Sequence, residues 1–245
     1  MTDALRVDDG ELPSTVGVRG PRTRLLTAGR PVAQALLRRW YDMEFHGIER
    51  VPITGPVVMA ANHVGWIDGP LLAICSPRPV HALTKQEMFA RGLGGFLLAS
   101  GQIPLDRSHV DVRAIRIAVQ ALRGGLAVGV FPEGARGAGD MTSPRAGAAY
   151  LALITGAPVV PVSFLGTRMP GGTDGSIPPR GSRLVMTFGE PVRLGTQPWP
   201  RTQQQVTRAA ALVTAGILET MRTAEEATGL TLPGPVAPKP EKKKA

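Results

Sequence analysis

With 245 residues, of which 43% are hydrophobic and 19% charged, the chain is too apolar to be disordered and long enough to bury a sizeable core. Its formal net charge of +9 favours anionic partners such as nucleic acid, anionic lipid or a phosphorylated substrate. The single cysteine, Cys75, excludes a disulfide framework and a cysteine-based zinc site, and we expect it to be a small buried side chain.

The N-terminal part is predicted to hold a flexible end and then a helix. Residues 1–24 are polar and carry early acids without an apolar segment, so we expect no signal peptide. An amphipathic helix is predicted over about 31–45, with Pro31 in its first turn. One side of this helix collects its apolar residues: Val32, Ala33, Leu36, Leu37 and Trp40.

After residue 52, short apolar runs alternate with helical segments. Strands are predicted at 57–61, 80–84, 126–131, 158–163 and 183–189. Helices are predicted at 70–76, 86–99, 109–123, 145–155 and 202–227. This alternation indicates an α/β fold, with a central, mostly parallel or mixed sheet flanked by helices and an N-terminal amphipathic helical element. We assign one domain to 25–232 and a disordered basic tail to 233–245.

One stretch, 147–166, has no charged residue and invites comparison with a membrane span. Its Gly-Ala-Pro centre and its second proline instead predict a buried helix, a turn and a buried strand.

The segment MAANHVGWIDGPLL, residues 59–72, sets His63 and Asp68 among uncharged neighbours. Each has an ordinary explanation: Asp68 precedes Gly69 and Pro70 as a helix N-cap, and a histidine at a strand end is usually a hydrogen-bonded scaffold residue. On one continuous helix the two side chains would lie roughly 140° apart. They meet only if a strand ends, a turn passes through Gly65 and a helix then begins. In that geometry Asp68 would orient the imidazole, and its free nitrogen would act as a general base on a substrate hydroxyl.

A metal site is the alternative chemical interpretation of these residues. His63, Asp68 and His81 could supply ligands, but neither an HxH nor an HExxH spacing is present. We therefore expect no metal.

Two further segments carry candidate binding residues. SGQIPLDRS, 100–108, contains Arg107, and AVGVFPEGARGAGD, 127–140, runs from a buried strand into a loop with Glu133 and Arg136. A guanidinium suits a phosphate because it gives bidentate, permanently charged contacts. Surface salt bridges and an ordinary Pro-Glu-Gly turn are the structural alternatives. The loop also has glycines that would let the backbone approach a ligand closely: Gly134, Gly137 and Gly139.

Taken together, these segments resemble the glycerolipid acyltransferase family, in particular the 1-acylglycerol-3-phosphate (lysophosphatidate) acyltransferases. Asn62 and His63 with Asp68 match its NHxxxxD block. GQIPLDR (101–107), FPEGAR (131–136) and APVVPVSFLG (157–166) resemble its second, third and fourth blocks. The four blocks occur in order over roughly residues 48–167.

The resemblance implies a mechanism and a set of site residues. His63 would deprotonate an acceptor hydroxyl, which attacks an acyl thioester, while Asp68 holds the imidazole. The donor would be acyl-CoA or acyl carrier protein, and no cofactor is implied. The residues implied in substrate binding are Arg107, Glu133, Gly134, Arg136 and Lys85.

The implied acceptor is a lysophospholipid, 1-acylglycerol-3-phosphate, which would give phosphatidate. The chain departs from the family pattern at Gly65, where serine is common, and at Ala135 and Gly137, where threonine and serine are common. These lost hydroxyls leave a glycolipid, another lysolipid or glycerol-3-phosphate as alternative acceptors.

The resemblance also implies a membrane partner. Family members have an N-terminal helical element that meets the membrane, and Arg30, Arg38 and Arg39 of the 31–45 helix would be available to lipid headgroups. Core packing is the alternative interpretation of this helix. We expect a peripheral protein on the cytoplasmic face of the cell membrane. A basic nucleic-acid-binding protein is supported by charge alone, and since aromatic residues are few we expect no nucleic acid partner.

Overall fold

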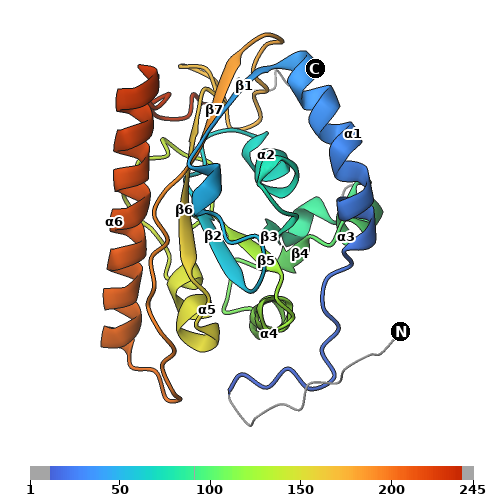
Figure 1. Cartoon of the computed structure of the whole chain (residues 1–245), viewed down its shortest axis with the longest axis vertical. Helices are drawn as coiled ribbons and strands as arrows, with labels where there is room; N and C mark the ends of the chain where they lie inside the picture. Colours follow the sequence, from blue (N-terminus) through green and yellow to red (C-terminus); the bar gives the residue numbers. More distant parts are fainter. Residues whose placement is uncertain (1–11, 91, 239–245) are drawn as a thin grey trace, which may run out of the picture.

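The computed structural model describes residues 12–90 and 92–238, which form one seven-stranded sheet covered by helices on both faces (Figure 1). The strand order is β1-β7-β6-β2-β5-β3-β4. All neighbours are parallel except β6 and β7, so β1 and β7 run opposite to the other five strands. The strands are β1 Asp42–His46, β2 Val57–Ala61, β3 Val80–Lys85, β4 Ile103–Leu105, β5 Ala127–Val130, β6 Val159–Leu165 and β7 Arg183–Phe188. The predicted α/β class with a mostly parallel sheet is confirmed.

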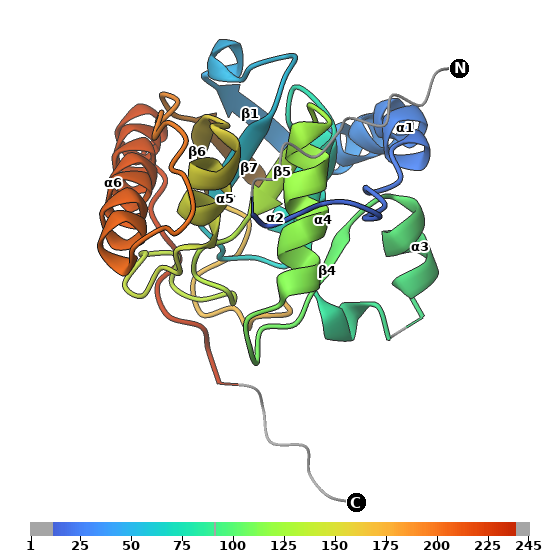
Figure 2. The same cartoon turned by 90° about the horizontal axis from the view of Figure 1, so that it is seen from below.

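The helices divide between the two faces of the sheet (Figures 1 and 2). Helices α1, α2 and α3 cover one face, and α4, α5 and α6 cover the other. Their bounds are α1 Arg24–Trp40, α2 Asp68–Cys75, α3 Gly94–Ala99, α4 Val112–Arg123, α5 Gly147–Thr155 and α6 Gln203–Thr228. Two 3₁₀ turns lie at Ile48–Arg50 and Gln86–Met88.

Strand β2 shows why the sheet is buried on both faces. All its residues are buried, and successive side chains alternate between two hydrophobic cores. Val58 and Ala60 belong to the core under α4, α5 and α6. Val57, Met59 and Ala61 belong to the core under α2. An uncharged, continuously apolar run is therefore the pattern that this central strand requires.

The apolar sides of the outer helices face the core. Ala118, Val119 and Leu122 of α4 are buried, and Asp111 caps this helix by accepting a hydrogen bond from the Ala114 amide. In α6, Val213, Ile217 and Met221 are buried. Helix α6 begins with a capping box, in which Thr202 and Gln205 each bond the other's backbone amide.

Helix α1 starts earlier than predicted, at Arg24, and contains Pro31 in its interior. The prediction used proline as a start signal, but packing on α2 overrides that signal. Arg30 donates to the carbonyl oxygens of Ile74 and Ser76, and Gln34 donates to that of Ile74. The helix is thus held on both sides of the proline.

The expected apolar side of α1 is divided between core and solvent. Leu37 packs against the core beneath α2, whereas Val32, Leu36 and Trp40 are exposed. The helix ends at Trp40 because Tyr41 adopts an extended conformation. The following residues form β1, which the sequence had placed in the helix, because they pair with the distant strand β7.

The predicted helix 86–99 is also two separate elements. A 3₁₀ turn at Gln86–Met88 precedes α3, and Gly94 at the start of α3 packs directly on the backbone of Phe89. Strand β4 is short and was not predicted, since its three residues pair with only part of β3.

The structure describes a part of each expected chain end. Residues 12–23, expected to belong to a flexible end, lie against α4, where Arg116 donates to the carbonyl oxygens of Ser14 and Val16. Residues 233–238, expected in a disordered tail, come after α6 in the chain, and the Ala237 amide donates to the Gly172 carbonyl. The expectations for 1–11 and 239–245 lie outside the described residues.

The uncharged stretch 147–166 forms a helix, a turn and a strand, as predicted. Helix α5 ends at Thr155 with Gly156 as its C-cap, and β6 follows as a fully buried strand. Over 12–90 and 92–238, no helix combines the length and apolar character needed to cross a bilayer.

Candidate active site

The candidate residues gather at one edge of the sheet because β2, β5, β3 and β4 run parallel. The carboxyl ends of parallel strands meet at the same edge, which is where α/β proteins bind ligands. His63 follows β2, Glu133 and Arg136 follow β5, Lys85 ends β3, and Arg107 follows β4. Segments far apart in the sequence therefore meet at this carboxyl edge.

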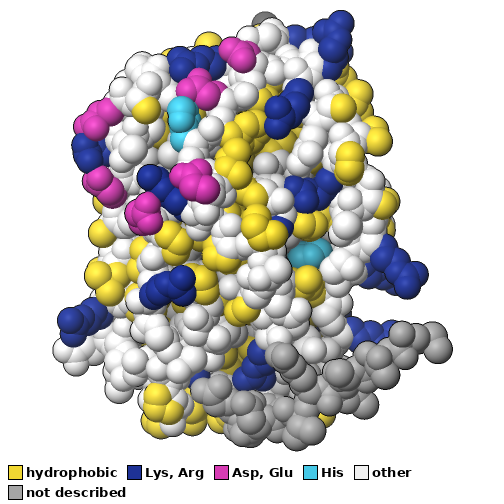
Figure 3. Space-filling view, viewed as in Figure 1, with side chains coloured by type: hydrophobic (Ala, Val, Ile, Leu, Met, Phe, Trp, Pro, Cys, Tyr) yellow, Lys and Arg dark blue, Asp and Glu magenta, His cyan; other side chains and the backbone are white. Residues whose placement is uncertain are grey.

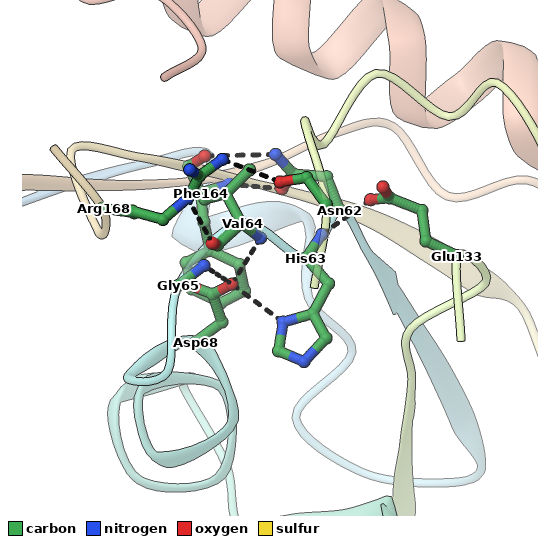
Figure 4. A network of polar contacts seen from close by, with 9 residues as sticks. Asn62, His63, Val64, Gly65, Asp68, Glu133, Phe164 and Arg168 are labelled. Carbon is green, nitrogen blue, oxygen red and sulfur yellow. Dashed lines mark hydrogen bonds and ion pairs between the residues drawn. The ribbon is translucent and has the colours of Figure 1, made fainter. Parts of the chain in front are cut away.

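Asn62 fixes the point where β2 ends. Its side-chain amide donates to the Phe164 carbonyl at 3.2 Å, and its amide oxygen accepts from the Phe164 backbone N–H at 2.7 Å (Figure 4). Asn62 is fully buried. This two-sided contact with β6 holds the next residue, His63, at a defined position.

Asp68 lies at the start of α2, but its carboxylate turns back onto the preceding turn (Figure 4). One oxygen, Oδ2, accepts hydrogen bonds from His63 Nδ1 at 2.9 Å and from the backbone amides of Val64 and Gly65, each at 2.8 Å. The side chain is fully buried. The structure thus has the strand, turn and helix start that the sequence required, and Asp68 bonds the turn instead of acting as an N-cap.

The His63 imidazole is fixed on two sides. Nδ1 contacts Asp68, and the ring stacks on Phe131 with centroids 4.1 Å apart. Because a carboxylate only accepts hydrogen bonds, Nδ1 carries the proton and the neutral ring has its lone pair on Nε2. The side chain is 17% exposed, so the site is sheltered but open to a reactant.

The backbone of His63 is held by the 131–140 loop. Its N–H donates to Glu133 Oε1 at 2.8 Å, and its carbonyl accepts from the Gly137 amide at 2.9 Å. Burial raises the pKa of Glu133 to about 7, and the negative charges of Asp140 and Asp68 act in the same direction. Amide hydrogen bonds to the carboxylate partly oppose this rise. Glu133 is therefore engaged with the histidine turn itself.

Two glycines are required by the close approach of backbone segments. A Cβ on Gly65 would lie 2.3 Å from the Thr167 carbonyl oxygen, which explains why serine does not fit here. Gly139 has a positive φ of 80°, and a Cβ there would lie 2.2 Å from Val64 Cγ1. The sequence suggested that Gly139 would approach a ligand, whereas it packs against the histidine turn.

The basic candidates lie around the same loop. Arg107 donates to the Gly134 carbonyl, and Gly134 has a positive φ of 69° in the turn after β5. Lys85 pairs with Glu87 at 3.1 Å and is partly exposed. Arg136 is half-buried and directly precedes Gly137, whose amide contacts the His63 carbonyl.

His81 does not join His63 and Asp68. It is buried on β3, and its Nδ1 contacts the Gly101 carbonyl at 2.9 Å. Burial lowers the pKa of His81. Within the described part of the chain, no three His, Cys, Asp or Glu side chains are grouped so that they could hold a metal ion.

Arg168 is the main residue that sequence reasoning missed. It follows β6, is only 2% exposed, and donates to the carbonyl oxygen of Val64 (Figure 4). It also donates to the carbonyl oxygen of Gly137. The available signal was an arginine placed directly after a long uncharged run, because a buried charge must find partners.

The fold and the site define an α/β protein in which a buried aspartate orients a histidine at the carboxyl edge of a mostly parallel sheet. A family model described as Acyltransferase matches residues 42–165, about half of the chain. The chain belongs to this family.

Two curated relatives share the central part of the chain. The 1-acyl-sn-glycerol-3-phosphate acyltransferase of Bacillus subtilis is 32% identical over 120 residues, which are 48% of this chain and 60% of that protein. The chloroplastic 1-acyl-sn-glycerol-3-phosphate acyltransferase BAT2 of Brassica napus is 28% identical over 158 residues, which are 62% of this chain and 43% of that protein. The chain thus spans about half the length of these relatives.

A solved structure shares the fold. The crystal structure of the 1-acyl-sn-glycerophosphate (LPA) acyltransferase PlsC from Thermotoga maritima matches with a TM-score of 0.58 and 24% identity. The match covers 80% of this chain and 79% of that chain.

Proposed function

We propose that the protein is an acyltransferase that moves a fatty acyl group from an acyl thioester to the hydroxyl of a lysophospholipid. The observation that carries the proposal is the hydrogen bond from His63 Nδ1 to the buried Asp68, which leaves Nε2 to receive a proton. Membership of the Acyltransferase family and the names of the relatives support this reaction class.

In the proposed step, His63 Nε2 takes the proton of the acceptor hydroxyl while the oxygen attacks the thioester carbonyl carbon. The tetrahedral intermediate then collapses, the carbon–sulfur bond breaks, and the thiolate leaves with the proton from His63. Asp68 stabilises the imidazolium that forms between these two events. The thioester carries its own activation, so the proposed reaction needs no cofactor. The donor is acyl-CoA or acyl carrier protein.

The proposed acceptor is 1-acylglycerol-3-phosphate, with phosphatidate as the product. Two relatives that match this chain are named for that substrate. Arg136 lies on the loop that contacts the His63 backbone, and Arg107 donates to the Gly134 carbonyl of the same loop. Both would supply positive charge to the phosphate, with Lys85 at the same edge. A glycolipid, another lysolipid and glycerol-3-phosphate are the competing acceptors.

A panel of lysolipids and glycerol-3-phosphate, offered with labelled acyl-CoA or acyl carrier protein, tests the reaction when products are read by mass. We expect phosphatidate from 1-acylglycerol-3-phosphate and no transfer by His63→Ala. His46→Ala is the matched control, because His46 lies at the end of β1 on the other edge of the sheet. Unchanged transfer by a folded His63→Ala variant would refute the assigned base.

The acceptor site is tested separately. Arg136→Ala should raise KM for the phosphorylated acceptor by about tenfold, since a charge-assisted contact contributes about 1.5–3 kcal/mol. Arg208→Ala, on the exposed surface of α6, is the control. An Arg136→Ala variant with the same KM would reject the phosphate role.

We also propose peripheral attachment to the cytoplasmic face of the cell membrane through α1. Hydrophobic side chains gather on the surface over α1, among Lys and Arg (Figure 3). The exposed ones on this helix are Leu25, Val32, Leu36 and Trp40. Helix α3 lies beside the start of α1 in both views and exposes Phe96 and Leu98 (Figures 1 and 2).

Basic side chains at the C-terminal end of α1 would contact the anionic lipid headgroups. Arg38, Arg39 and Arg180 line a groove of about 650 Å³, and Arg180 lies 4.9 Å from the centre of the Trp40 ring. Trp40 is two residues before Asp42, which starts β1, and β1 runs opposite to β2. This end of α1 therefore lies at the carboxyl edge that holds His63. Helices that lie in the membrane interface typically insert apolar side chains into the bilayer next to basic side chains that contact the headgroups.

Sedimentation with anionic vesicles tests the membrane contact. Leu36→Ser should reduce the bound fraction, while Leu212→Ser on α6 should not, and the two leucines are similarly exposed at 53% and 51%. Equal losses in both variants would reject α1 as the contact.

A further inference from the structure

Arg168 is a buried arginine whose hydrogen bonds all go to backbone carbonyl groups. Nε donates to Val64 at 2.9 Å, Nη1 donates to Gly172 at 2.8 Å and Pro235 at 3.2 Å, and Nη2 donates to Gly137 at 2.9 Å and Gly234 at 2.6 Å. These bonds use the planar fork of the guanidinium in full. No other side chain offers five N–H donors in one plane.

The carbonyl groups belong to segments far apart in the sequence. Val64 lies in the turn between His63 and Asp68, and its amide is one of the donors to Asp68. Gly137 lies in the loop after β5, and its amide donates to the His63 carbonyl. Arg168 therefore contacts both backbone segments that hold the histidine.

The third segment is the chain that follows α6. Leu232 packs against the hydrophobic core and lies next to Gly139, and Pro233 is buried. The carbonyl groups of Gly234 and Pro235 then bond Arg168. The C-terminal segment thus lies behind the histidine turn and shares one guanidinium with it.

The opposite charges of Arg168 and Asp68 also attract each other. Burial lowers the pKa of Arg168, and the negative charge of Asp68 opposes that shift. The attraction between the guanidinium and the Asp68 carboxylate therefore adds to the hydrogen bonds that hold the turn.

We infer that Arg168 is a positioning residue that locks the turn from His63 to Asp68 against the 131–140 loop, with the C-terminal segment 233–237 as the third part of the lock. The kinetic test of this inference rests on the proposed function. The hydrogen-exchange test rests on the backbone geometry alone. The inference gives the segment after α6 a part in the site through its hydrogen bonds to Arg168.

The first test replaces Arg168 by lysine, which keeps the charge but has no planar fork. We expect kcat for acyl transfer to fall at least tenfold, with KM for the acceptor within about threefold, because a small displacement of a catalytic group costs rate more than binding. Arg78→Lys is the matched control. Arg78 also donates to three backbone carbonyl groups, those of Pro52, Gly55 and Gly125, but at the amino ends of β2 and β5.

The second test disturbs the C-terminal segment in the full-length chain. Gly234 has a φ of 73° with open space around its Cβ position, so Gly234→Val strains the backbone without creating a clash. Gly195→Val is the control, because Gly195 has a φ of 69° and equally open surroundings in the loop before α6. Gly234→Val should lower kcat in the same way as Arg168→Lys, and the double variant should lose little more than either alone.

Amide hydrogen exchange, measured without any substrate, separates this inference from the proposed function. The amides of Val64, Gly65 and Gly137 should exchange at least tenfold faster in Arg168→Lys and in Gly234→Val, and not in the controls. If the wild-type protein transfers no acyl group, the proposed function fails and the exchange result alone decides the inference. Should Arg168→Lys fail to fold, Gly234→Val carries the test.

Unchanged exchange and unchanged kcat in folded variants would overturn the positioning role. Fully additive losses in the double variant would overturn the part assigned to the C-terminal segment.

Discussion

The replacement Asp68→Asn tests the core of the site with almost no change in shape. Oδ2 of Asp68 accepts from His63 Nδ1 and from two backbone amides, and the side chain has no exposed surface. An asparagine oxygen can still accept from the Val64 and Gly65 amides. The turn should therefore keep its backbone path, while the imidazolium formed during transfer loses its negative partner.

The size of the effect follows from these contacts. A hydrogen bond to a charged group contributes about 1.5–3 kcal/mol and a neutral one about 0.5–1.5 kcal/mol. Their difference, about 1–2 kcal/mol, corresponds to a loss of about 5-fold to 30-fold in kcat. Complete loss of an oriented base costs about 10²–10⁴ in rate. We expect kcat for Asp68→Asn to fall about 100-fold, with the free energy of unfolding lower by no more than about 2 kcal/mol.

Single-turnover transfer of a labelled acyl group measures the rate, and urea unfolding measures the stability. Thr202→Ala is a suitable control, since it removes the N-cap of α6 and costs about 1 kcal/mol of stability without touching the site. A folded Asp68→Asn variant that keeps kcat within twofold of the wild type would refute the role that we assign to this carboxylate.

Three further predictions concern neighbouring residues. Folded Glu133 keeps its proton up to about pH 7, whereas an unfolded glutamate loses it near pH 4.5. Between these two pH values the native state binds more protons than the unfolded state. The free energy of unfolding therefore falls as the pH rises through this range. Glu133→Gln should remove this decline, which we expect to be about 1–2 kcal/mol for a partly exposed group. Urea unfolding at pH 5 and pH 7.5 measures it, and an equal decline in the free energy of unfolding of both proteins would contradict the prediction. Gly65→Ser should lower the free energy of unfolding by about 1–3 kcal/mol, because its Cβ would meet the Thr167 carbonyl, whereas Gly95→Ser, with open space, should not. Burial raises the pKa of the Cys75 thiol to about 11, so alkylation at pH 8 should be at least tenfold slower in the folded than in the urea-unfolded chain; equal rates would count against it.

Several features of the fold followed from local patterns. The buried strands β2, β5 and β6 are continuous apolar runs, and α4 and α6 show regular stripes, so their types and approximate bounds were predictable. The pairing of His63 with Asp68 was also accessible, because the apolar run, the turn glycine and the Gly-Pro helix start lie within one short segment.

Other features depend on contacts between distant segments. Local pattern predicts the end of a helix where strand β1 lies, because the partner of β1, strand β7, lies about 140 residues further along the chain. Pro31 suggested a helix start, whereas Arg30 and Gln34 bind the end of α2 and hold a helix on both sides of it. Local preferences are weak compared with such tertiary contacts.

The sequence by itself determined the α/β class, the order of the four family-like segments and the short segment in which His63 and Asp68 could meet across a turn. Each of these depends on residues close together in the chain. Only the tertiary structure decided that Glu133 bonds the His63 backbone and that Arg168 joins Val64, Gly137 and the C-terminal segment. The physical reason is that a buried polar group must be satisfied by whichever backbone groups the fold brings to it. Those partners come from β5, β6 and the chain after α6, and no local spacing in the sequence records their meeting.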